Sequence, residues 1–120
     1  MRALFDSNIL IDFLNGIPAA RTELARYQSP AISVITWIEV LVGATPKAEA
    51  ATRGFLSGFE SIEVSAAISE KAVAIRRELG LRVPDAIILA TAQTENLLLV
   101  TRNSKDFPAG SPGIRIPYRL

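Results

Sequence analysis

The chain contains no histidine and no cysteine, and only one methionine and one tryptophan. The absence of cysteine excludes disulfide bonds, thiolate metal sites and thiol nucleophiles. The absence of histidine removes the side chain that most often serves as a general base. No apolar run approaches the roughly 18–20 residues that are needed to cross a bilayer. If the protein carries out chemistry, carboxylates together with a bound metal ion are therefore the leading candidates.

The composition is that of a globular protein rather than a disordered one, because 49% of the 120 residues are hydrophobic and 21% are charged. We expect one domain over residues 1–120, large enough to bury a core without disulfides. The net charge of +1 gives no sign of polyanion binding by itself. Asp6 stands too early for the apolar region of a signal peptide, so we expect a cytoplasmic protein with no membrane segment.

Short apolar strands alternate with helical patterns along the whole chain. Strands are expected at residues 2–6, 31–34, 62–64, 97–100 and 114–116. Helices are expected at residues 7–16, 18–27, 35–43, 46–59, 68–79 and 84–95. The helices at 35–43 and 84–95 are so apolar that both are predicted to be mostly buried. The alternation predicts an α/β fold in which helices cover both faces of a parallel β-sheet.

Four acids stand at the edges of these elements or inside the apolar helices, namely Asp6, Glu39, Asp85 and Asp106. Asp6 ends the first strand, and open α/β sheets bind ligands at the carboxyl ends of their strands. Glu39 has no lysine or arginine three or four residues away, and an unpaired buried carboxylate is costly. A divalent cation would neutralise such acids together, and oxygen ligands suit Mg²⁺ or Mn²⁺.

Each acid also has a purely structural interpretation. Asp6 could cap the helix that follows it. Glu39 could complete a capping box that begins at Thr36. Asp85 could complement the dipole of its helix, and Asp106 could stand in an Asx-type turn. From the residues alone, a shared metal site and a set of local structural roles both remain open.

Four blocks follow one another in the sequence: 5–12 (FDSNILID), 33–43 (SVITWIEVLVG), 84–92 (PDAIILATA) and 100–107 (VTRNSKDF). In this order they resemble the blocks of PIN-domain ribonucleases, and most closely those of VapC-type toxins. The resemblance spans nearly the whole chain, including the closing residues 116–118. It implies a small α/β/α domain with an endoribonuclease site that depends on Mg²⁺ or Mn²⁺.

By this resemblance Asp6, Glu39 and Asp85 match the first three catalytic acids, and Asp6 and Asp85 hold the principal ion. Asp106 is expected to supply the fourth acid. Many PIN domains carry an acid where this chain has Asn103, so either residue could fill the fourth position.

Other residues of the same blocks are expected to support the four acids. Those that could orient the carboxylates or the substrate are Ser7, Asn8, Thr101 and Asn103. Those that could contact RNA phosphates are Arg102 and Lys105, with Arg76, Arg77 and Arg82 as a second basic patch or a partner contact. Asp12 falls outside the apolar stripe of its helix and is predicted to face solvent.

The resemblance implies that metal-activated water hydrolyses RNA phosphodiesters. It also implies a cognate VapB-type antitoxin that reaches the acidic site, and a homodimer. Two alternatives remain from the sequence: a metal-dependent nuclease or phosphatase acting on another substrate, and an inactive PIN scaffold that serves as a binding module.

Overall fold

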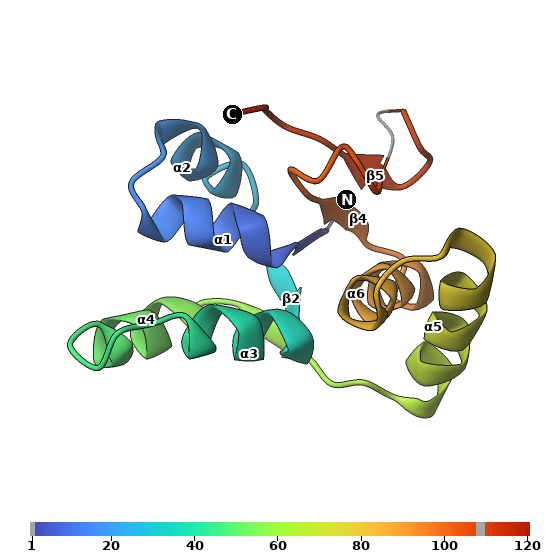
Figure 1. Cartoon of the computed structure of the whole chain (residues 1–120). Coiled ribbons are helices and arrows are strands. Elements are labelled where there is room, and N and C mark those ends of the chain that lie inside the picture. The colour runs from blue at the N-terminus through green and yellow to red at the C-terminus, as the bar shows by residue number, and fades with distance from the viewer. Residues whose placement is uncertain (1, 108–109) are drawn as a thin grey trace.

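The computed structural model describes residues 2–107 and 110–120. A five-stranded parallel sheet with the strand order β3-β2-β1-β4-β5 forms the centre of the molecule (Figure 1). The strands are β1 (Ala3–Phe5), β2 (Ala31–Ser33), β3 (Glu60–Ile62), β4 (Leu98–Val100) and β5 (Ile114–Arg115). The helices are α1 (Ser7–Leu14), α2 (Pro18–Leu24), α3 (Val34–Val42), α4 (Glu49–Leu56), α5 (Ala66–Leu79) and α6 (Val83–Thr94). Within the described residues, no helix is both long enough and apolar enough to cross a membrane.

Helices cover both faces of the sheet, which confirms the predicted α/β/α arrangement. Helices α1 to α4 lie on one face, and α5 and α6 lie on the other (Figure 1). Successive side chains of a strand point to opposite faces. Ala3 and Phe5 therefore pack in the core under α1 to α4, whereas Leu4 packs in the core under α5 and α6.

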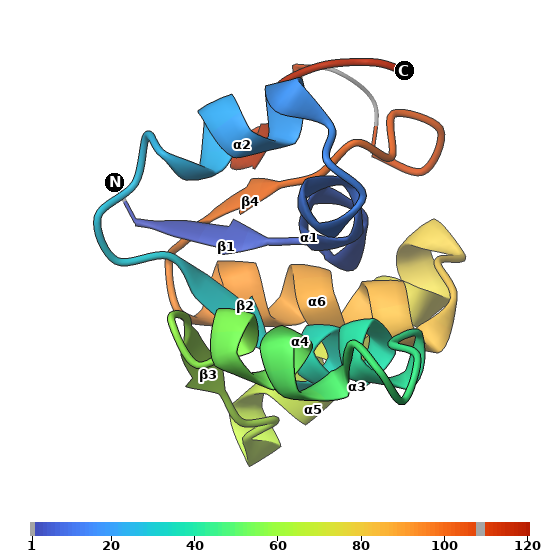
Figure 2. The same cartoon turned by 90° about the vertical axis from the view of Figure 1, so that its left-hand side faces the viewer.

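Strand β1 lies at the middle of the sheet, and its carboxyl end marks the place where the strand order changes direction. From β1 the chain builds outward through β2 and β3, and β4 and β5 then pair on the other side. Figure 2 shows β1 between β2 and β4, leading directly into α1. The backbone N–H of Asp6 donates to the carbonyl of Val100 at 2.9 Å. Such a switch point is where open α/β sheets form a ligand crevice.

Several predicted boundaries are wrong, including the end of the helix predicted at 18–27, which lies at Leu24. The helix expected to start at Pro46 begins after a turn instead, and the Thr45 hydroxyl accepts a hydrogen bond from the Ala48 N–H at 3.2 Å within that turn. The strand predicted at 62–64 lies at Glu60–Ile62, because its residues pair with the three residues of β2 and the Glu60 N–H donates to Pro30. The pairing with β2 thus sets the position of β3.

The two helices predicted to be mostly buried differ. The middle of α6 is buried as predicted. Helix α3 buries only part of its surface, and Ile38, Glu39 and Val42 are exposed, with Val42 at 80%. The prediction for α3 was wrong because an apolar sequence does not by itself say how many faces of a helix find a neighbour.

Candidate active site

A polar pocket of about 450 Å³ opens at the carboxyl edge of the sheet. Its lining comes from the start of α1, from α3, from the start of α6 and from the segment after β4. The lining residues are Asp6, Ser7, Asn8, Ile11, Glu39, Arg82, Asp85, Arg102, Asn103, Ser104 and Lys105. The fold therefore brings three of the four predicted acids to one pocket, together with most of the residues predicted to support them.

Asp6 is the most deeply buried acid of the pocket, with an exposed fraction of 5%. It caps α1, and its Oδ1 accepts the Ser7 N–H at 2.7 Å. Its Oδ2 accepts the Thr101 hydroxyl at 2.7 Å. Burial raises the pKa of this carboxyl to about 6; the hydrogen bonds from Thr101 and Ser7 oppose that rise, and the carboxylates of Asp85 and Glu39 add to it.

Asp85 projects into the pocket from the first turn of α6, which begins with proline near its first position. Its Oδ2 is buried, and the described residues offer this oxygen no hydrogen-bond partner. Arg82 forms an ion pair with this same oxygen, since its Nε lies 3.4 Å from Asp85 Oδ2, but no hydrogen bond joins them and the Arg82 side chain is 85% exposed. A buried carboxylate oxygen with no hydrogen bond is costly unless another positive group binds it.

Glu39 reaches the pocket from the exposed side of α3. Its Oε1 accepts the Ser7 hydroxyl at 2.6 Å. The alternative that Glu39 completes a capping box with Thr36 does not hold, because α3 starts earlier and Ser33 caps it by accepting the Ile35 N–H at 3.1 Å. The structural alternative for Glu39 is therefore removed, and its carboxylate faces the pocket without a local capping role.

The fourth sequence block places Asn103 in the pocket and leaves Asp106 outside the pocket lining. The Asp106 side chain is exposed, and its Oδ2 accepts the Asn103 amide at 2.9 Å. In return the Asp106 N–H donates to Asn103 Oδ1 at 3.2 Å. These two bonds close a turn, so the contacts made by Asp106 are those of a residue that holds Asn103 in place.

Ser7, Asn8 and Thr101 make the contacts expected of residues that orient carboxylates. Ser7 joins Asp6 to Glu39 through its N–H and its hydroxyl. The Asn8 amide donates to Thr101 Oγ1 at 3.2 Å, and Thr101 donates in turn to Asp6. The side chains between the acids thus form a connected network of hydrogen bonds.

The prediction that Asp12 faces solvent is wrong. Asp12 is 4% exposed and pairs with Arg102, whose Nε lies 2.6 Å from Asp12 Oδ2. The partner lies 90 positions away in the sequence, so helical periodicity could not reveal it. The exposed cations at the pocket are Lys105, as predicted, and Arg82. Arg76 and Arg77 line a separate groove, so the basic patch predicted for these two residues with Arg82 is divided.

The donor set of the pocket fits a hard divalent cation. Among the described residues, no group of three or more histidine, cysteine, aspartate or glutamate side chains is close enough together to enclose an ion. Mg²⁺, however, commonly uses one or two carboxylates and keeps several waters. Asp6 and Asp85 interact electrostatically, and Asp85 lines the pocket with one buried oxygen that accepts no hydrogen bond. These two acids can supply the carboxylate ligands that such an ion needs.

The protein thus has an α/β fold with an acidic pocket at the switch point of its parallel sheet, and the side chains of this pocket offer oxygen ligands to a metal ion. Residues 3–109 match the family model described as the PIN domain. The chain therefore belongs to the PIN-domain family, a family of nucleases that are typically metal-dependent. A comparison with curated protein sequences found no match.

Solved structures similar to this one include chains of toxin–antitoxin complexes. A chain of a toxin–antitoxin complex from Klebsiella pneumoniae is 52% identical, with a TM-score of 0.92 over 98% of this chain and 99% of that chain. A chain of VapBC2 from Rickettsia felis, bound to a promoter DNA fragment, is 28% identical, with a TM-score of 0.77 over 95% and 96%. A chain of DNA-bound VapBC from Salmonella typhimurium is 26% identical, with a TM-score of 0.80 over 96% of each chain. The protein is thus homologous to VapC toxins.

Proposed function

We propose that this protein is a Mg²⁺- or Mn²⁺-dependent endoribonuclease and the toxin of a type II toxin–antitoxin system. The observation that carries the proposal is the pocket that Asp6, Glu39 and Asp85 enter from three different elements. The buried Asp85 oxygen supports a cation there, because it accepts no hydrogen bond and its one ion pair is to the highly exposed side chain of Arg82. The resemblance of the four sequence blocks to PIN-domain ribonucleases supports RNA as the substrate.

Asp6 and Asp85 are the residues that would hold the ion. When bound, the ion lowers the pKa of a coordinated water and offsets charge that develops on the phosphate oxygens. Burial raises the pKa of the Asp6 carboxyl to about 6, so this group is largely ionised at neutral pH and is available as a ligand. Thr101 and Ser7 hold both of its oxygens in position.

Glu39 is the group that we assign to accept a proton from the attacking water. Its carboxylate is exposed to the pocket, and the Ser7 hydroxyl fixes one oxygen at 2.6 Å. A general base must lie within hydrogen-bond reach of the proton that it takes, and an anchored carboxylate at the pocket meets this need. Water that attacks the phosphorus, with cleavage of the P–O3′ bond and departure of the ribose 3′-oxygen as a hydroxyl, leaves a 5′-phosphate and a 3′-hydroxyl. A 2′,3′-cyclic phosphate product would exclude this route.

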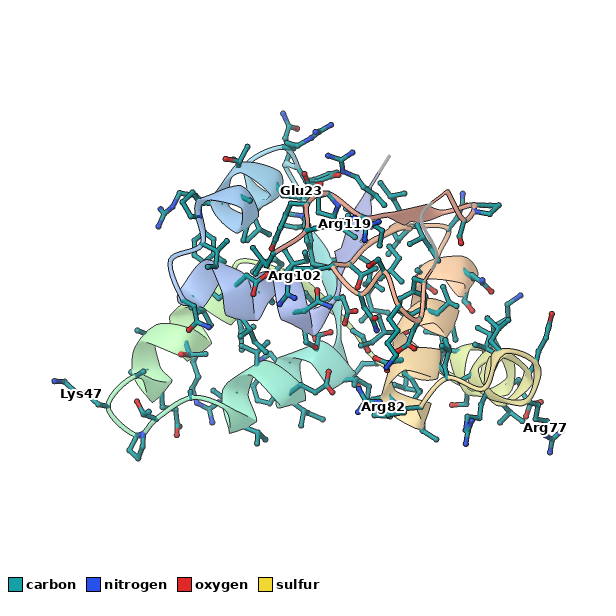
Figure 3. All side chains as sticks on the ribbon, turned by 45° about the horizontal axis from the view of Figure 1, so that its top comes forward. Glu23, Lys47, Arg77, Arg82, Arg102 and Arg119 are labelled. Carbon is teal, nitrogen blue, oxygen red and sulfur yellow. The ribbon has the colours of Figure 1, made fainter. Side chains whose placement is uncertain are left out.

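Phosphate contacts fall to Lys105 and Arg82, the two exposed cations that line the pocket. Arg82 also forms an ion pair with Asp85 at 3.4 Å, but no hydrogen bond joins the two, and its side chain is 85% exposed and thus accessible to a phosphate. Figure 3 shows Arg82 at the start of α6, below Arg102. Arg102 was predicted as a phosphate contact, but its guanidinium is bound to Asp12 through two hydrogen bonds. Positive groups beside an acidic centre are required because the carboxylates alone repel RNA.

We assign the fourth position of the site to Asn103. Asn103 lines the pocket, whereas Asp106 lies outside that lining and forms two hydrogen bonds with Asn103. An amide at this position reduces the negative charge of the site by one compared with a fourth acid. Asp106 then contributes through the turn rather than as a ligand.

An apolar groove of about 360 Å³ between α1, α3 and α4 is the surface that we assign to the antitoxin. Ile11 and Leu14, each about two-fifths exposed, lie along it. Ile11 lines both this groove and the acidic pocket, so the two adjoin at this side chain. A segment of the antitoxin bound in the groove would therefore need to pass only Ile11 to enter the active site. The similar structures described as toxin–antitoxin complexes support a partner of this kind.

A second apolar groove of about 310 Å³ lies between α5 and α6, and we assign it to a homodimer. Val73 and Val83 line it and are half exposed, and Leu79 is 57% exposed on the same helix as Val73. Apolar side chains gathered in this way mark an interaction surface. Light scattering that gives a monomer at micromolar concentration would contradict this assignment.

The proposed activity is tested with antitoxin-free protein and total cellular RNA in Mn²⁺, in Mg²⁺ and in EDTA. Asp6→Asn is the inactive variant, and Glu70→Gln, an exposed acid on α5, is the matched control. We expect discrete fragments with wild type and Glu70→Gln in metal only, and none with Asp6→Asn. Matched RNA and DNA oligonucleotides that span a mapped cleavage site then identify the substrate class. A folded, metal-binding protein that leaves all RNA intact would overturn the ribonuclease assignment.

A further inference from the structure

We propose that Asp12 is a positioning residue of the active site, acting through Arg102 and shared with Tyr118 of the C-terminal segment. The inference rests on the proposed function, because it concerns the same pocket. Asp12 does not line that pocket, and no catalytic role follows from its position in the sequence. Its influence runs through the segment that follows β4.

Asp12 and Arg102 form a two-pronged ion pair. Arg102 Nε donates to Asp12 Oδ2 at 2.6 Å, and Arg102 Nη2 donates to Asp12 Oδ1 at 3.0 Å. The Tyr118 hydroxyl donates to Oδ2 as well, at 2.7 Å. A guanidinium–carboxylate pair with two parallel bonds fixes orientation as well as distance, and here the Asp12 side of the pair is buried while Arg102 is one-third exposed. Arg102 thus lies against α1 and under the C-terminal segment (Figure 3).

The same short segment is tied to the catalytic acids by its backbone and by Thr101. The Arg102 N–H donates to Asn8 Oδ1 at 3.1 Å, and Thr101 donates to Asp6 at 2.7 Å. The Asn103 N–H donates to Thr101 Oγ1 at 3.1 Å. The ion pair that holds the Arg102 side chain therefore positions the two neighbours of Arg102. Thr101 binds Asp6, and Asn103 lines the pocket.

Asp12 also keeps the Arg102 guanidinium away from the catalytic acids. Arg102 itself lines the pocket that contains Asp6, Glu39 and Asp85. Without its partner, the guanidinium would lie beside three carboxylates, which attract it as they would attract a metal ion. Loss of the Asp12 charge should therefore both loosen the segment after β4 and add an internal competitor for the cation.

The plain alternative is that this ion pair only stabilises the fold. The chain provides a matched control for that alternative in the cluster formed by Glu23, Arg115 and Tyr27. Arg115 binds Glu23 through two bonds of 2.7 and 3.0 Å, and the Tyr27 hydroxyl donates to Glu23 at 3.0 Å. Glu23 is 3% exposed, and none of the three residues lines the acidic pocket. The two clusters have the same chemistry, but only the Asp12 cluster holds a side chain of the segment after β4. The Arg115 carbonyl accepts the Thr101 N–H at 3.1 Å as part of the pairing of β4 with β5, and Glu23→Gln leaves this backbone bond in place.

The test compares Asp12→Asn with Glu23→Gln in three measurements: hydrogen exchange of residues 101–107, Mn²⁺ affinity, and kcat and KM for RNA. For Asp12→Asn we expect faster exchange in 101–107. We also expect Mn²⁺ affinity to fall about ten-fold and kcat to fall by about ten-fold or more, as for other residues that hold a catalytic group in place. Glu23→Gln is expected to lower thermal stability while leaving all three quantities close to wild type.

Equal changes in the two variants, or unchanged exchange, Mn²⁺ affinity and kcat in Asp12→Asn, would overturn the proposal. Should Asp12→Asn not fold, Tyr118→Phe decides the question against Tyr27→Phe, because each removes one hydroxyl from its cluster. Only Tyr118→Phe is then expected to change exchange in 101–107, and equal exchange in both would overturn the proposal. A wild type that cleaves no RNA would refute the proposed function, whereas the exchange and Mn²⁺ comparisons would still decide the role of Asp12.

Discussion

Replacing Asp6 by asparagine should make the metal-free protein more stable at neutral pH. Asp6 is 5% exposed, and burial raises the pKa of its carboxyl from an ordinary value of 3.8 to about 6. Between pH 3.8 and pH 6, the Asp6 carboxyl is therefore largely protonated in the folded state and largely ionised in the unfolded state. The contribution of Asp6 to stability is therefore fully present below pH 3.8, falls as the pH rises through this window, and is lost above pH 6.

The size of the effect follows from the two pKa values. Each pH unit between them corresponds to about 1.4 kcal/mol, so ionised Asp6 destabilises the metal-free fold by about 3 kcal/mol. Asparagine has the shape of the protonated acid, and its one oxygen can still accept the Ser7 N–H as a helix cap. Its NH2 group replaces the oxygen that accepts the Thr101 hydroxyl, so the loss of that bond subtracts from the gain. Asp6→Asn should thus raise the free energy of unfolding at pH 7.5 by up to about 3 kcal/mol, and by almost nothing near pH 4.

Urea unfolding of wild type and Asp6→Asn, in EDTA from pH 4 to pH 8, measures this difference directly. The comparison isolates Asp6, because every other titrating group is common to both proteins. Saturating Mn²⁺ should reverse the order, since binding stabilises only the protein that keeps the ligand. A variant that is no more stable than wild type at pH 7.5, or a difference that does not change with pH, would refute the reasoning.

Three further predictions concern the core, the backbone and the pocket. Leu99→Ala, at a fully buried position of β4, should lower the free energy of unfolding by about 2–5 kcal/mol in urea, and a loss below about 1 kcal/mol would contradict the packing described. Gly80→Ala should lower the melting temperature, because Gly80 ends α5 with a φ of +70°, which alanine adopts only with strain. Gly54→Ala should raise the melting temperature, because Gly54 lies within α4 and nothing lies within 4 Å of an added Cβ. Shifts of the same sign in the two variants would contradict both expectations. Lys105→Ala should raise the KM for RNA with little change in kcat and weaken the salt dependence of binding, and an unchanged KM would remove Lys105 from the phosphate contacts.

The sequence predicted those parts of the fold that depend on local signals. The apolar run before Asp6 predicted the central strand, and Gly80 predicted the end of α5, where it adopts the left-handed conformation. The alternation of strands and helices predicted the parallel sheet, and a parallel sheet brings the carboxyl ends of β1 and β4 to one edge. That is why Asp6 and Thr101 could be expected to meet.

The missed features depend on contacts between distant segments. The burial of Asp12 is due to Arg102 and Tyr118, and no periodicity within α1 encodes those partners. The exposure of α3 around Glu39 depends on which neighbours the helix finds, and its apolar composition pointed the other way. The different positions of Asn103 and Asp106 follow from one tight turn that their spacing alone does not define.

The central claim is that Asp85 and Asp6 hold one divalent ion in the acidic pocket. Mn²⁺ binding by electron paramagnetic resonance, on wild type, Asp85→Asn and Asp106→Asn, tests this claim most directly. We expect wild type to bind Mn²⁺. Asp85→Asn should bind it at least ten-fold more weakly, because the variant loses the buried carboxylate oxygen that would bind the ion. Asp106→Asn should bind it with an affinity close to wild type. Equal affinities for wild type and Asp85→Asn would contradict the claim.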